Sequence, residues 1–91
     1  MIDYKKVETA QKLLEESGAQ FMLAYDKGDK HCSCRVNGQY PMIKGFIIAA
    51  MWQAIKDVYS QCGIGMASNE VFAIASAVIE RLRAKEEDKQ Q

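Results

Sequence analysis

The start of the chain carries apolar side chains at the three- and four-residue spacing of an amphipathic helix. Polar residues fill most positions between them, and the apolar positions are Tyr4, Val7, Ala10, Leu13 and Leu14. Asp3 precedes this stripe as a helix N-cap, and Gly18 follows it as a residue that ends helices. The pattern predicts a helix over about residues 3–17.

After Gly18 the spacing of the side chains changes from the helical period to a period of two, which predicts a β-hairpin over about residues 20–37. Gly28 supplies the positive φ that a tight turn favours, so the turn is expected at Lys27–Gly28. Cross-strand partners share a face, so this turn places Phe21 opposite Cys34. The expected buried face holds Phe21, Leu23, Cys32, Cys34 and Val36, and the expected outer face holds Met22, Ala24, His31, Ser33 and Arg35.

Two more helices are predicted, over about residues 41–62 and 68–86, with a charged C-terminal tail at about 84–91. Pro41 suits a first helical turn, and Gly63 and Gly65 separate the two helices. The later helix has one apolar stripe, formed by Val71, Phe72, Ala75, Val78, Ile79 and Leu82. The predicted fold is one small α+β domain, residues 1–91, in the order α-β-β-α-α. Its two-stranded antiparallel hairpin packs on three helices, and helix 41–62 lies at the centre.

Helix 41–62 has an unusual distribution of polar residues. At about 100° per residue, Gln53, Lys56, Asp57 and Ser60 gather on one side of its second half. In the first half the same side is apolar and consists of Met42, Ile43, Phe46, Ala49 and Ala50, called here the helix patch. An apolar side must be covered. Either a second copy of the chain covers the helix patch, or the first helix or the hairpin covers it within one chain.

The composition narrows the functional classes. The chain has 91 residues, with 12 basic and 12 acidic side chains, and 48% of its residues are hydrophobic. Such a small domain buries only about 60–65% of its unfolded surface, so its own core is marginal. The charge balance gives no support to a dedicated nucleic-acid binder or to a DNA mimic.

Cysteine usage and the N-terminus indicate where the protein acts. The three cysteines are Cys32, Cys34 and Cys62, an odd number that argues against a disulfide scaffold. The N-terminus lacks an apolar secretory core, and no uncharged run reaches the roughly 20 residues of a membrane span. We therefore expect a reduced, cytoplasmic protein with free thiols and no membrane contact.

The chemically reactive residues form no established motif. Cys32 and Cys34 are expected as small buried apolar residues, and a structural zinc site would need four ligands. His31 is the only histidine, and it points away from its neighbour Cys32 on a strand. No cofactor, metal site or catalytic residue is predicted. A thiol or small-ligand site near Cys32, Cys34 and Cys62 is the least favoured alternative.

The sequence therefore predicts a non-enzymatic protein–protein interaction module that forms a homodimer through the helix patch. Small size and a lack of catalytic groups are typical of accessory proteins of bacteria and phages. The alternative function is weak nucleic-acid binding by the outer hairpin face, through Lys27, Lys30, His31 and Arg35.

Overall fold

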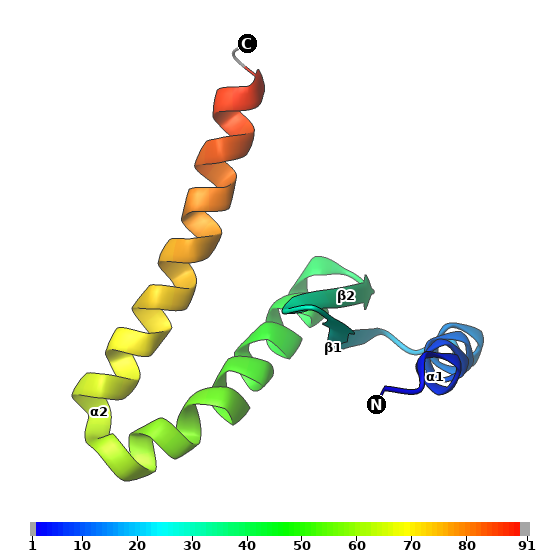
Figure 1. Ribbon diagram of the computed structural model, residues 1–91, viewed down its shortest axis with the longest axis horizontal. Helices are drawn as coiled ribbons and strands as arrows, with labels where there is room; N and C mark the ends of the chain where they lie inside the picture. The colour runs from blue at the N-terminus through cyan, green and yellow to red at the C-terminus, as the bar shows by residue number, and fades with distance from the viewer. Residues whose placement is uncertain (1, 90–91) are drawn as a thin grey trace. The chain divides into compact units, whose positions relative to one another are not determined.

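The computed structural model describes residues 2–89, which combine helices with one antiparallel hairpin (Figure 1). The elements are α1 (Tyr4–Ser17), β1 (Phe21–Gly28), β2 (His31–Asn37) and α2 (Tyr40–Lys89). The predicted mixed class and the antiparallel hairpin are confirmed. The chain divides into two compact units, Met1–Ile48 and Ala49–Gln91. The first unit holds α1, the hairpin and the start of α2, and the second holds the rest of α2.

Both ends of α1 are capped by the residues that the sequence indicates. The Asp3 side chain accepts a hydrogen bond from the Lys6 backbone N–H at 3.3 Å, which satisfies one of the free donors of the first turn. Gly18 takes a left-handed conformation, with φ 77°, and its N–H donates to the Glu15 carbonyl. Because these caps are local, the sequence around α1 is sufficient to define its span.

The hairpin turn lies at Asp29–Lys30, so the predicted turn at Lys27–Gly28 is wrong. Both turn residues have positive φ, 52° and 63°, which is the pattern of a two-residue type I′ turn. Gly28 also has positive φ, 89°, but it lies at the irregularity in register between Asp26 and Gly28. The Asp26 carboxylate accepts from the Gly28 N–H at 2.7 Å and stabilises that bulge.

The new turn changes the register and therefore the two faces of the hairpin. Cys34 pairs with Ala24 rather than with Phe21, a shift of three residues along β1. Because side chains alternate along a strand, a shift by an odd number of residues moves every β2 side chain to the other face relative to β1. One face now holds Phe21, Leu23, Tyr25, Ser33 and Arg35, and the opposite face holds Met22, Ala24, Asp26, Cys32, Cys34 and Val36. The predicted sorting into an apolar face and an outer face is wrong.

A side-chain contact joins the base of the hairpin to the start of α2. The Gln39 carbonyl accepts the first helical hydrogen bonds, from Met42 and Ile43. The Gln39 N–H, which precedes the helix, donates to Oε1 of Gln20 at 2.9 Å. This bond fixes the entry of the chain into α2, because it satisfies a backbone donor that the helix itself leaves free.

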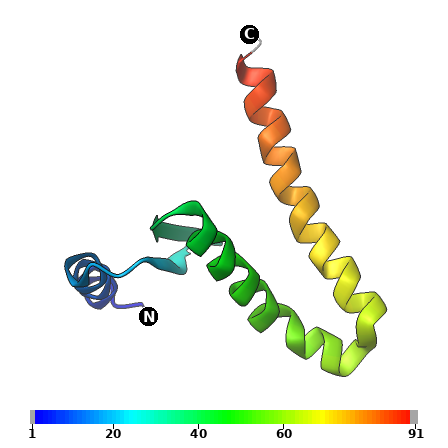
Figure 2. The same cartoon turned by 180° about the vertical axis from the view of Figure 1, so that it is seen from behind.

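The two predicted C-terminal helices form one element, α2, with a kink at Gly63, so the structure has two helices in place of the predicted three. Gly63 is the residue of α2 with non-helical angles, φ 85° and ψ 177°. Figure 2 shows the bend of the ribbon in this part of α2. Only glycine adopts this region readily, and the helix resumes directly after it. One glycine therefore bends the helix where the sequence predicted a break of several residues.

Little of the chain is buried. Among the described residues, the buried hydrophobic side chains are Phe21 in β1 and Ala67 in α2. Met22, Leu23 and Tyr25 are partly buried beside Phe21. From Asn69 to Lys89 every residue is exposed, including the whole predicted apolar stripe. A single copy thus leaves most of its apolar side chains in contact with solvent.

Candidate interaction surface

The helix patch lies in the first three turns of α2, where no local feature breaks the helix. Met42 is 45% exposed, Ile43 and Phe46 are partly buried, and Ala49 and Ala50 are exposed. The apolar side that the sequence identified is therefore at least partly accessible at each of its five positions.

The helix patch is symmetric in sequence about Phe46. Met42 and Ala50 lie four residues on either side of it, and Ile43 and Ala49 lie three residues on either side. In each pair one member is large and the other is alanine. Two such helices placed antiparallel would therefore set a large side chain against a small one on both sides of Phe46, which is how packed surfaces interdigitate.

A second exposed apolar surface follows Gly63. Phe72 is 69% exposed, Val78 54% and Leu82 65%. These residues belong to the predicted stripe, and polar residues such as Ser76, Glu80 and Arg83 lie on the other side of the same helix. The helix is amphipathic, and its apolar side is in contact with solvent in the single chain.

The four basic residues proposed for nucleic-acid contact do not share one face. Lys30 lies in the turn, and Lys27 lies at the bulge. Arg35 shares a face with Phe21 and Leu23 rather than with Met22 and Ala24. All four side chains, His31 included, belong to exposed residues. Nucleic-acid binding through Lys27, Lys30, His31 and Arg35 stays a prediction.

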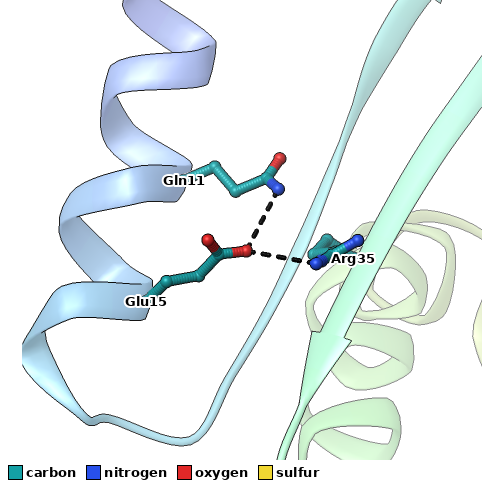
Figure 3. Close-up of polar contacts among 3 residues, drawn as sticks. All are labelled: Gln11, Glu15 and Arg35. Carbon is teal, nitrogen blue, oxygen red and sulfur yellow. Dashed lines mark hydrogen bonds and ion pairs between the residues drawn. The ribbon is translucent and has the colours of Figure 1, made fainter.

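Arg35 has a carboxylate partner that the sequence did not reveal. Its guanidinium lies 3.4 Å from Oε1 of Glu15 in α1, and the same oxygen accepts from Nε2 of Gln11 at 3.2 Å (Figure 3). The two charged side chains are 60% and 40% exposed, so the pair contributes at most about 1 kcal/mol. It nonetheless directs the arginine toward α1. The periodicity of α1 and β2 carries no signal for this contact, because it depends on the hairpin register.

Cys32 and Cys34 are exposed, which contradicts their expected burial. Cys32, Cys34 and Cys62 are all free thiols on the surface of the single chain. Cys32 and Cys34 lie on the hairpin face opposite Phe21, because the register differs from the predicted one. Within residues 2–89, no group of three or more His, Cys, Asp or Glu side chains is arranged to hold a metal ion.

The helix α2 is long and apolar enough to cross a membrane by length and composition alone. One such helix is a weak indication by itself; the core helix of a soluble protein that passes the same test is mostly buried, whereas only 6% of this apolar window is buried in the single chain. Every 20-residue window of α2 contains at least one charged residue, among them Lys44, Lys56, Asp57, Glu70 and Glu80. A charge at the centre of a membrane helix costs about 2.5–3.5 kcal/mol on insertion scales.

No protein-family model, no curated protein and no solved structure matches this chain.

Proposed function

We propose that the protein is a non-enzymatic interaction module that self-associates as a homodimer through the helix patch. The observation that supports this is the exposure of apolar residues in the single chain. Met42, Ala49 and Ala50 are exposed on the side of α2 that is polar in the later turns. Contiguous apolar surface of this kind is typical of a surface that a partner covers.

The energetic argument rests on what burial of the helix patch would contribute. Fully burying a methionine or phenylalanine side chain is worth about 1.5–3 kcal/mol. Met42 offers roughly half of its surface, and Phe46 offers the part that the chain leaves open. Ala49 and Ala50 lack long side chains, so a second helix can approach closely there. In a two-fold dimer each contribution is counted twice.

A second copy of the chain fits this surface because the helix patch is symmetric about Phe46. In an antiparallel arrangement Met42 lies against Ala50 of the second copy, and Ile43 lies against Ala49 of the second copy. A two-fold axis then passes beside Phe46, as an isologous interface requires. A parallel arrangement would instead set Met42 against Met42 and alanine against alanine, which leaves unfilled space.

A protein partner is favoured over a lipid surface by two features of α2. Lys44, Lys56 and Asp57 interrupt its first half. Gly63 has non-helical angles inside α2, and a departure from helical geometry is tolerated in lipid only where other groups satisfy the backbone. Charged side chains and non-helical backbone carry a small free-energy penalty at a hydrated protein interface and a large one in the hydrocarbon core of a membrane.

The protein acts in the cytoplasm with reduced thiols, takes no cofactor and catalyses no reaction. Its small size suits an accessory role in a bacterium or a phage.

The test is a measurement of mass in solution. Size-exclusion chromatography with light scattering on the full chain, at tens of micromolar, should give twice the chain mass. A monomer at this concentration would reject the proposal. Flotation with neutral and anionic vesicles distinguishes the lipid alternative, because a membrane-bound protein would float and a soluble dimer would not.

A further inference from the structure

We draw no further inference here: the strongest candidate, the exposed apolar stripe of α2 after Gly63 that includes Phe72, Val78 and Leu82, carries nothing because nothing in the structure shows what covers it.

Discussion

Introducing a carboxylate into the helix patch is predicted to separate the proposed dimer into folded monomers. Phe46 is partly buried within its own chain, so at most about a third of its burial energy is available to a partner. This amounts to at most about 1 kcal/mol per chain, or about 2 kcal/mol across a two-fold interface. The lost burial alone should raise the dissociation constant of the proposed dimer by up to roughly 30-fold, since 1.4 kcal/mol corresponds to a factor of ten. The two carboxylates that Phe46→Glu places at the interface should raise it further, because burying an unpaired charge is costly. Sedimentation velocity over a dilution series measures this change.

Phe46→Glu also removes an apolar contact inside the chain, so a second variant is needed. Ala49→Glu places the carboxylate in the same patch at an exposed position, where it removes no buried side chain. Ala77→Glu is the matched control, because Ala77 is also an exposed alanine and lies on the polar side of the later part of α2. Far-UV circular dichroism should show unchanged helix content in all three. If Ala49→Glu and Ala77→Glu dimerise as well as the unmodified chain, the helix patch is not the interface.

Three further predictions concern single positions. Met42→Ala and Ala50→Met should each weaken the proposed dimer. The double variant should restore the affinity if the two residues pack against each other across an antiparallel interface. A double variant that dimerises more weakly than either single variant would exclude that pairing. Gly28→Ala should lower the thermal stability more than Gly18→Ala. Both glycines have positive φ, but a Cβ on Gly28 would lie 3.2 Å from the Tyr4 hydroxyl, whereas a Cβ on Gly18 would contact nothing. Equal losses of stability would show that the Tyr4 hydroxyl does not lie close to Gly28. Gly63→Ala should straighten α2, because alanine cannot adopt φ 85°, ψ 177° without strain. Spin labels seven residues on either side of this position should then lie about 21 Å apart, as in an unbroken helix, and an unchanged shorter distance would contradict the role given to the glycine.

The types of element could be predicted from the sequence because each depends on short-range periodicity. The first helix carries its own stop signals, Asp3 and Gly18, so its span needs no tertiary information. The change to alternating periodicity likewise identified the hairpin. These features depend on residues within a turn or two of each other, which is the range over which sequence patterns are informative.

The hairpin register could not be predicted, because two local solutions compete for the same residues. Gly28 can serve in a turn or in a bulge, and Asp29 tolerates the left-handed conformation that lets the turn move toward β2. The choice also involves the Asp26 carboxylate, which accepts from the Gly28 N–H. A shift of the turn moves every side chain of one strand to the other face, so the observed register places Arg35 on the face of Phe21 and places Cys32 and Cys34 on the opposite face. The candidate nucleic-acid strip depended on that register, whereas the helix patch did not.

The helix patch and the later stripe of α2 show why amphipathic periodicity identifies a face but not its partner. Both surfaces were identified from spacing alone, and both are accessible in the single chain. The helix patch has a second property, since its large residues precede Phe46 and its alanines follow Phe46 at the same spacings. Hydrophobic burial is non-directional and would accept many partners. Shape is what distinguishes them, so the size exchange between Met42 and Ala50 tests the identity of the partner, whereas the carboxylate variants test only that a partner exists.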